Sequence, residues 1–280
     1  KFVLSRLDYK IHNLNQLSHD DSVEPITRAS VSVQKFGKLG ESEVITPKHI
    51  CKDMIDMIDD ADLRAVIDNG GKVLDIAGKA GEFALAVFEK YIALGYDKEA
   101  LKNAIYTIPT SGITYEFARM IYEILGLNVD NIASKFTSYS LLKVKDEDGD
   151  IDYTKIAALL RQSKPFNIIT MNDEITEGDE NVNFDVVLGN PPYQVSDGGA
   201  QASARPIYHN FVDISKKVEP SFMSLIMPTR WYAGGKGLDE FRNDMLNDTS
   251  IAELHDFLHP EEVFPDTNNR GGVCYLLWDH

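Results

Sequence analysis

Residues 184–193 read Phe-Asp-Val-Val-Leu-Gly-Asn-Pro-Pro-Tyr, and this stretch decides the fold. The apolar run at its start predicts a buried parallel strand that stops at Gly189. The two prolines that follow exclude both helix and ladder pairing, so they fix an extended backbone at the carboxyl end of the strand. Ligands of open α/β sheets bind outside that end. We therefore expect residues 190–193 to line a binding site.

The residue types in 190–193 suit a planar ring that carries an amino group, such as adenine. The side-chain oxygen of Asn190 and the backbone carbonyl of Pro191 can accept hydrogen bonds from an exocyclic amine. Pro192 keeps that carbonyl from rotating away, and Tyr193 can stack on the ring face. We therefore expect these four residues to contact such a ring. A rigid turn with a packing tyrosine is the structural alternative.

A second motif, residues 72–83, reads Lys-Val-Leu-Asp-Ile-Ala-Gly-Lys-Ala-Gly-Glu-Phe. It predicts a strand, a turn of small residues and a helix that runs from Gly81 through Tyr91. Glycines let a backbone approach a ligand closely, and the helix N-terminus offers unpaired N–H groups. The turn lacks both the Walker A and the G-x-G-x-x-G spacing. Alone, it is equally compatible with an ordinary strand–helix connection.

Together the two motifs resemble the N6-adenine DNA methyltransferases of restriction–modification systems, over about residues 37–278. The resemblance implies a Rossmann-like α/β fold with a mostly parallel central sheet, and S-adenosylmethionine as the cofactor. It implies a catalytic role for residues 190–193 and cofactor contacts from Asp75, Ala77, Gly78 and Gly81. The chain departs from the commoner Asp-Pro-x-x-Gly-x-Gly form of this loop, because Ile76 replaces the proline and Lys79 replaces the first glycine.

Two further cofactor positions follow from the resemblance. Thr46 would lie over the methionine end of the cofactor, and it also reads as the N-cap of a helix that begins at Pro47. A strand over residues 166–170 would place the Asp173 carboxylate near the cofactor adenine, although Asp173 also fits the start of an acidic loop. The ribose contact stays open, since the strand over residues 104–108 ends without an acidic residue.

The region after residue 193 resembles the part of the family that completes the target-base pocket. Phe264 would form the second wall opposite Tyr193, with a core aromatic as the alternative. We expect strands over residues 222–231 and 271–278, and helices over residues 206–214 and 239–245. His255 and His259 have helical i, i+4 spacing, but no third ligand follows. We therefore predict no metal site, and there is no G-x-S-x-G elbow.

Composition and charge limit the partners. The 280 residues, 43% hydrophobic, can bury a full α/β core, and only two cysteines indicate a reducing cytoplasm. No apolar run reaches membrane-spanning length. The formal net charge of −16 opposes binding to a polyanion. The basic residues that could face DNA all follow residue 193: Arg205, Lys216, Lys217, Arg230, Lys236 and Arg242.

We expect residues 1–39 to form a small N-terminal helical segment and residues 40–280 to form the catalytic domain. The resemblance implies that double-stranded DNA is bound through a recognition domain beyond residue 280, with fused nuclease or helicase regions as further partners. The favoured function is site-specific DNA adenine N6-methylation. Methylation of a protein glutamine or an RNA adenine is the first alternative, and a non-catalytic nucleotide-binding scaffold is the second.

Overall fold

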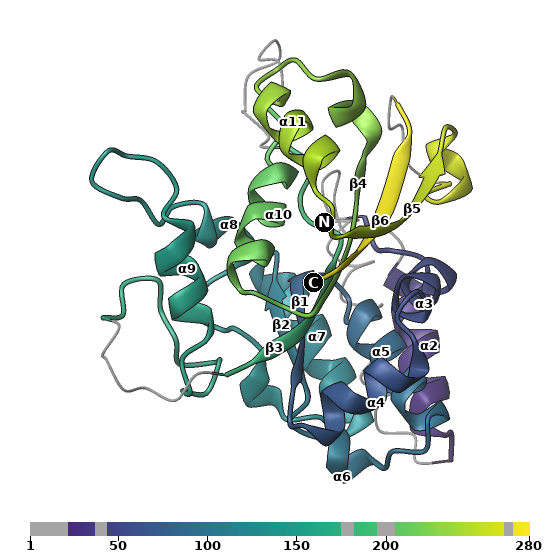
Figure 1. Ribbon diagram of the computed structural model, residues 1–280. Helices are drawn as coiled ribbons and strands as arrows, with labels where there is room; N and C mark the ends of the chain where they lie inside the picture. Colours follow the sequence, from purple (N-terminus) through teal and green to yellow (C-terminus); the bar gives the residue numbers. More distant parts are fainter. Residues whose placement is uncertain (1–21, 37–43, 175–181, 195–204, 266–270) are drawn as a thin grey trace, which may run out of the picture.

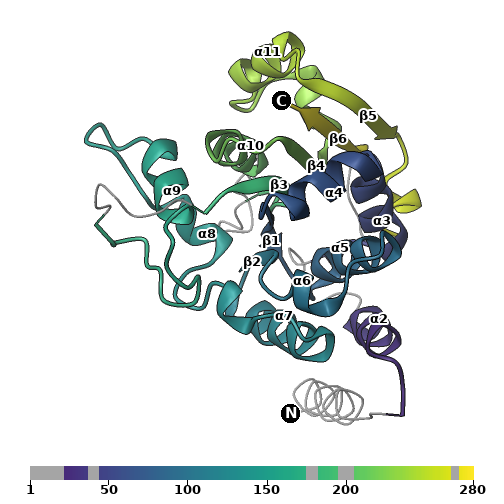
Figure 2. The same ribbon diagram turned by 60° about the horizontal axis from the view of Figure 1, so that its bottom comes forward.

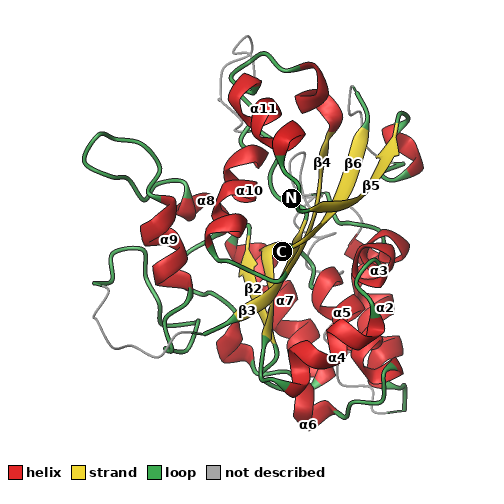
Figure 3. Ribbon diagram, viewed as in Figure 1, coloured by secondary structure: helices red, strands yellow, loops and turns green. Residues whose placement is uncertain are grey.

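The fold is built on one twisted six-stranded sheet (Figure 3). The computed structural model describes residues 22–36, 44–174, 182–194, 205–265 and 271–280. The strands are β1 (Lys72–Gly78), β2 (Ile105–Pro109), β3 (Phe184–Gly189), β4 (Phe222–Pro228), β5 (Ile251–Phe257) and β6 (Val273–Asp279). Their order is β2-β1-β3-β4-β6-β5, with the first four parallel and β6 antiparallel to both neighbours. The expected mostly parallel α/β sheet is confirmed.

Helices cover both faces of this sheet (Figures 1 and 2). In chain order they are α2 (Pro25–Phe36), α3 (Lys48–Asp56), α4 (Asp60–Asp68), α5 (Glu82–Ala93), α6 (Lys98–Leu101), α7 (Gly112–Leu125), α8 (Ser138–Leu141), α9 (Tyr153–Leu160), α10 (Tyr208–Lys217) and α11 (Asp239–Asn247). Short 3-10 turns occupy Val129–Asn131, Thr229–Ala233 and Pro260–Glu262. Both views place α3 and α5 on one side of the sheet and α10 and α11 on the other.

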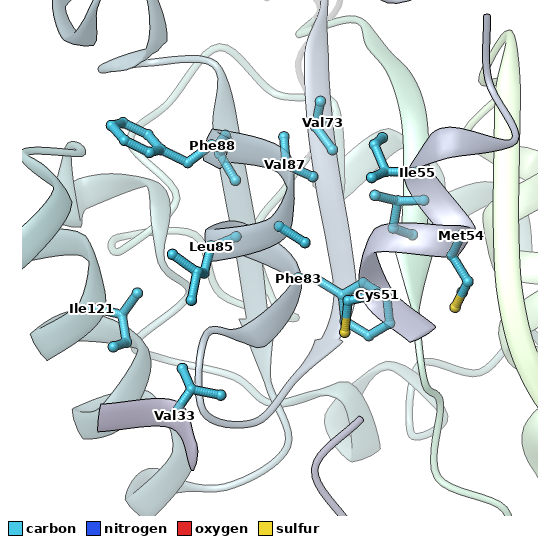
Figure 4. Packing of buried hydrophobic residues seen from close by; sticks show 14 of the residues in the cluster. Val33, Cys51, Met54, Ile55, Val73, Phe83, Leu85, Val87, Phe88 and Ile121 are labelled. Carbon is cyan, nitrogen blue, oxygen red and sulfur yellow. The ribbon is translucent and has the colours of Figure 1, made fainter. Parts of the chain in front are cut away.

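Two hydrophobic cores follow from the period-2 alternation of the strands. On β1, Val73 enters the core shared with α3, α4, α5 and α7, whereas Leu74 enters the core shared with α9, α10 and α11. On β6, Tyr275 faces the first core and Leu276 the second. Figure 4 shows part of the first core, in which Val73 lies near Val87 of α5 and Ile55 of α3. Because both faces are covered, the parallel strands read as continuous apolar runs.

The N-terminal segment packs on this layer. Helix α2 buries Ala29 and Val33 in the first core, and Val33 lies beside Leu85 of α5 and Ile121 of α7 (Figure 4). Within the expected N-terminal segment, residues 25–36 form helix α2, and the division into a helical segment and a catalytic domain stays a prediction. The boundary expected between residues 39 and 40 lies outside the described residues. No helix in the described ranges combines the length and apolarity that crossing a membrane requires.

Two local predictions were wrong. Residues 166–170 form turns rather than a strand, because the Asp173 carboxylate accepts from the backbone N–H and hydroxyl of Thr170 and closes a local loop. His255 lies on β5, so its spacing to His259 is not helical. β5 is an exposed antiparallel edge strand rich in charged residues, and such a strand carries no apolar alternation for sequence reading to find.

Candidate active site

The site lies where the strand order reverses. From β1 the chain turns to β2 on one side, and β3 then pairs with β1 on the other, with Asp75 opposite Leu188. The carboxyl ends of β1 and β3 are therefore neighbours, which is the usual ligand position in a doubly wound sheet. A Cβ placed on Gly189 would lie 3.6 Å from Asp75 Oδ1. This close approach joins the cofactor loop (residues 75–82) to the acceptor segment (residues 190–193).

Asn190 is held on three sides. Its side-chain Nδ2 donates to Thr46 Oγ1 at 3.1 Å and to the Val44 carbonyl oxygen at 3.4 Å. Its own main-chain carbonyl accepts a bond of 2.8 Å from the Lys79 ammonium. Only 3% of Asn190 is exposed, so this orientation is set by protein rather than by water. Both amide hydrogens are used, and Oδ1 is the side-chain acceptor that remains for a ligand.

Thr46 reaches the site in a way that the sequence prediction did not anticipate. Helix α3 begins at Lys48 with Pro47 in the cap position, and no side chain caps it, so the N-cap prediction for Thr46 was wrong. Instead, the Thr46 hydroxyl accepts from Asn190 and its backbone N–H donates to Glu82 Oε1 at 3.3 Å. Thr46 thus connects the cofactor loop to the acceptor segment.

Glu82 places a buried carboxylate at the end of the cofactor loop. It starts α5 directly after Gly81, whose φ of 77° lies in the left-handed region that favours glycine. The second Glu82 oxygen accepts from the Ala80 N–H at 2.8 Å, and the residue is 3% exposed. A buried carboxylate therefore already occupies the anion position at the helix N-terminus. This arrangement suits a cationic ligand better than a phosphate.

Asp75 adds a second buried carboxylate, with 2% exposure. Its Oδ1 accepts from the Ala77 N–H at 3.2 Å, while Oδ2 has no hydrogen-bond partner within the described residues. Burial raises the pKa of the Asp75 carboxyl well above its ordinary value, and the Glu82 charge raises it further. A Cβ on Gly78 would lie 2.8 Å from Oδ2, so only glycine lets the backbone pass this close.

These features fit S-adenosylmethionine. The methionine end of that molecule carries a sulfonium and an ammonium, and cations of this kind would pair with the unpartnered Asp75 oxygen. Ala77, Gly78 and Gly81 supply the tight backbone around it. Asp75 and Ala77 are bonded to each other within the loop, and Thr46 is bonded to Glu82 of the same loop and to Asn190. Their contact with the cofactor remains a prediction.

Three predicted residues make other contacts in the described structure than hydrogen bonds to Asn190, Thr46 or the cofactor loop. Tyr193 packs against the second core, with its ring centroid 6.5 Å from that of Tyr208, and its buried hydroxyl has no partner among the described residues. Phe264 is 2% exposed and belongs to the first core, so its role as the opposite wall stays a prediction. Asp173 bonds within its own turn, and its adenine contact also stays a prediction.

Sequence reading missed the three residues that hold the network together. Val44 acts through a backbone carbonyl, which no residue type reveals. Glu82 looked like an ordinary first-turn acid of α5. Lys79 carried the one usable signal, because a lysine stands where the related loops have glycine, and it is 2% exposed.

Comparison with known proteins supports one family. The family model "Eco57I restriction-modification methylase" matches residues 122–264, just over half of the chain. An uncharacterized adenine-specific methylase of Mycoplasma pneumoniae is 31% identical over 100 residues, which are 35% of this chain and 24% of that protein.

Solved structures share the fold. The type I restriction-modification methyltransferase subunit of Streptococcus thermophilus superposes with a TM-score of 0.54 at 16% identity, over 91% of this chain and 48% of that one. A putative class I S-adenosylmethionine-dependent methyltransferase of Listeria monocytogenes gives 0.52 at 11% identity, over 94% and 69%. The chain spans about a quarter of its curated relative and about half of the Streptococcus subunit. It belongs to the Eco57I restriction-modification methylase family.

Proposed function

We propose that this chain is the catalytic part of a site-specific DNA methyltransferase that transfers a methyl group from S-adenosylmethionine to N6 of a flipped adenine. The proposal rests on the hydrogen bonds that the side-chain amide of Asn190 makes. With both amide hydrogens bound by Thr46 and Val44, the residue presents only an acceptor to a substrate. An acceptor recognises an amino group and rejects a ring carbonyl. Membership in an adenine-methylating family points to the same base.

The residues of the chain act by positioning. Asn190 Oδ1 and the Pro191 carbonyl would accept from the two N6 hydrogens and turn the nitrogen lone pair toward the methyl donor. Accepting these hydrogens also favours the tetrahedral amine as positive charge develops on N6. Bound S-adenosylmethionine would supply the methyl group on a sulfonium sulfur, and that sulfur would keep the electron pair of the broken carbon–sulfur bond as N6 becomes methylated. The surplus N6 proton leaves to solvent.

DNA would approach along the carboxyl edge of the sheet. Arg230 and Lys236 are exposed and follow β4, which runs parallel to β3, so they lie at the same edge as the acceptor segment. Arg205, also exposed, leads into α10. Lys216 is unsuited to phosphate because it pairs with Asp248 at 2.6 Å.

This sparse basic rim does not offset a net charge of −16. Double-stranded DNA would therefore be gripped mainly by a recognition domain beyond residue 280, with nuclease or helicase regions as further partners. The buried cysteines, Cys51 and Cys274, are both free thiols, which is consistent with action in a reducing cytoplasm.

The test is methyl incorporation from labelled S-adenosylmethionine into unmethylated DNA, RNA and protein. We expect label at adenine N6 in DNA, and we expect Asn190→Ala to abolish it without weakening cofactor binding. Asn131→Ala is the matched control, since Asn131 is equally buried and donates to a backbone carbonyl outside the site. Label in protein or RNA alone would overturn the choice of substrate. Absence of cofactor binding would overturn the activity.

A further inference from the structure

We infer that Lys79 is a positioning residue for methyl transfer: its ammonium holds the peptide between Asn190 and Pro191 and thereby aims both hydrogen-bond acceptors of the site. The inference rests on the proposed function and adds a residue to it. The contact joins two loops that are 111 residues apart, and both residues are buried, at 2% and 3% exposure. A charge-assisted hydrogen bond between buried groups is stronger than a neutral one.

Because two prolines follow Asn190, this one hydrogen bond also affects the orientation of the Pro191 carbonyl. The peptide between Asn190 and Pro191 is planar, so fixing the Asn190 carbonyl fixes the position of the Pro191 nitrogen. The ring of Pro191 locks its φ, and the following Pro192 restricts Pro191 to extended ψ values. Few torsions are then left to move the Pro191 carbonyl. Fixing the carbonyl oxygen of Asn190 therefore also orients the carbonyl oxygen of Pro191.

Asn190 needs this clamp to complete its own support. Thr46 and Val44 accept hydrogen bonds from the side-chain amide, and the bond to the main-chain carbonyl of Asn190 comes from Lys79. Lys79 supplies the main-chain support from the other side of the site. The side chain and the backbone of the same residue are thus fixed by different loops, so Oδ1 and the Pro191 carbonyl keep one relative geometry.

The cost of burying an ammonium indicates that its position is used. Burial and Glu82 raise the pKa of Asp75, and the charge of Lys79 offsets only part of that rise, so the ammonium and this carboxyl lie close enough to interact. A glycine, the residue expected here from the related loops, could make no such contact. Lysine has the length to cross from the cofactor loop to the acceptor segment, and its ammonium has three hydrogens to donate.

The experiment compares Lys79→Met with wild type in three measurements: the dissociation constant for S-adenosylmethionine, the kcat of methyl transfer at saturating cofactor, and amide hydrogen exchange over residues 186–193 without cofactor. We expect kcat to fall about 10- to 150-fold, the range for a lost hydrogen bond to a charged group. The dissociation constant should stay within about threefold, and exchange should quicken about tenfold. Lys79→Arg should restore part of kcat.

Lys90→Met is the control, because Lys90 is an ion-paired lysine on the far part of α5 and should change none of the three. If Lys79→Met does not fold, Lys79→Gln keeps a donor without the charge and allows the same comparison. Weakened cofactor binding with unchanged kcat would show instead that Lys79 holds the cofactor. Unchanged exchange would overturn the clamp, even if the wild-type chain transfers no methyl group and the proposed function has failed.

Discussion

Replacing Asp75 with asparagine should move stability and cofactor binding in opposite directions. The carboxylate is 2% exposed, one of its oxygens has no partner in the described structure, and its pKa is raised by burial and by Glu82. A raised pKa in the folded state means that ionisation at neutral pH destabilises the cofactor-free protein. Asparagine keeps the acceptor for the Ala77 N–H and removes the charge. The cationic cofactor then loses its counter-charge.

The sizes of both effects can be estimated from the hydrogen bonds of Asp75. An unpaired buried polar atom costs about 1–3 kcal/mol, and an amide nitrogen left in place of Oδ2 keeps part of that cost. We expect Asp75→Asn to raise the free energy of unfolding by about 1 kcal/mol, or about 2–4 °C in melting temperature. Losing a hydrogen bond to a charged group, worth about 1.5–3 kcal/mol, should weaken cofactor binding by about 10- to 150-fold.

The pH dependence provides a second check. Because the folded pKa of Asp75 lies above the ordinary value of 3.8, its contribution to stability is fully present below about pH 4 and is lost as the pH rises through the folded pKa. The stability gap between Asp75→Asn and wild type should therefore widen from acid to neutral pH. Chemical denaturation at several pH values measures it, and isothermal titration calorimetry measures the binding.

Asp185→Asn is the matched control. Asp185 also has a raised pKa, because of burial, and an unpartnered buried oxygen in the described structure, but it lies at the amino end of β3, away from the site. Its replacement should leave cofactor affinity unchanged. If Asp75→Asn binds S-adenosylmethionine as tightly as wild type, or if it unfolds more easily than wild type at neutral pH, the reasoning about an unsatisfied counter-charge is refuted.

Three further outcomes are expected. Tyr193→Ala should weaken binding of a flipped adenine by about 1–3 kcal/mol, measured by fluorescence of a 2-aminopurine target, and unchanged affinity would remove Tyr193 from the pocket. Thr46→Val should lower kcat about 5- to 10-fold by freeing one Asn190 hydrogen, whereas Thr46→Ser should not; equal rates for the two variants would contradict the hydroxyl contact. Burial opposes ionisation of Asp248, but bonds from Lys216 and Ser250 outweigh it and lower its pKa to about 2, so the stability it contributes is lost between about pH 4 and pH 2. In Lys216→Met that loss should begin at higher pH in acid-unfolding curves; superimposable curves would exclude the pair as a source of acid stability.

The sequence predicted the parallel part of the fold because burial leaves a direct record there. Strands β1, β3 and β4 are covered on both faces, so each reads as an apolar run with a turn signal after it. Strand β5 leaves no such record, since five of its seven residues are exposed and none is buried, and charged residues of this kind are typical of an exposed edge strand. Residues 166–170 gave the opposite error. Phe166 and Ile169 are buried, as the residues of a strand would be, but they belong to a loop.

The sequence predicted several residues of the candidate site, but it did not predict which of them bond to one another. Asn190, Asp75 and the glycines of the cofactor loop stand in motifs whose chemistry can be read from residue type. The bonds from Val44, Thr46 and Glu82 depend on which loops the sheet brings together, and no local pattern encodes that. Thr46 shows the limit, because its sequence context predicted a helix cap while its hydroxyl serves a residue 144 positions away.

Those separations also affect how the molecule folds. The three partners of Asn190 lie 146, 144 and 111 residues from it along the chain, so none of these bonds can form from neighbouring sequence. Contacts of such high sequence separation carry a loop-closure entropy cost, and this cost slows their formation. A chain that has folded only its N-terminal half cannot orient the acceptor. Asn190 can therefore take its final orientation only after β1 and β3 have paired in the central sheet.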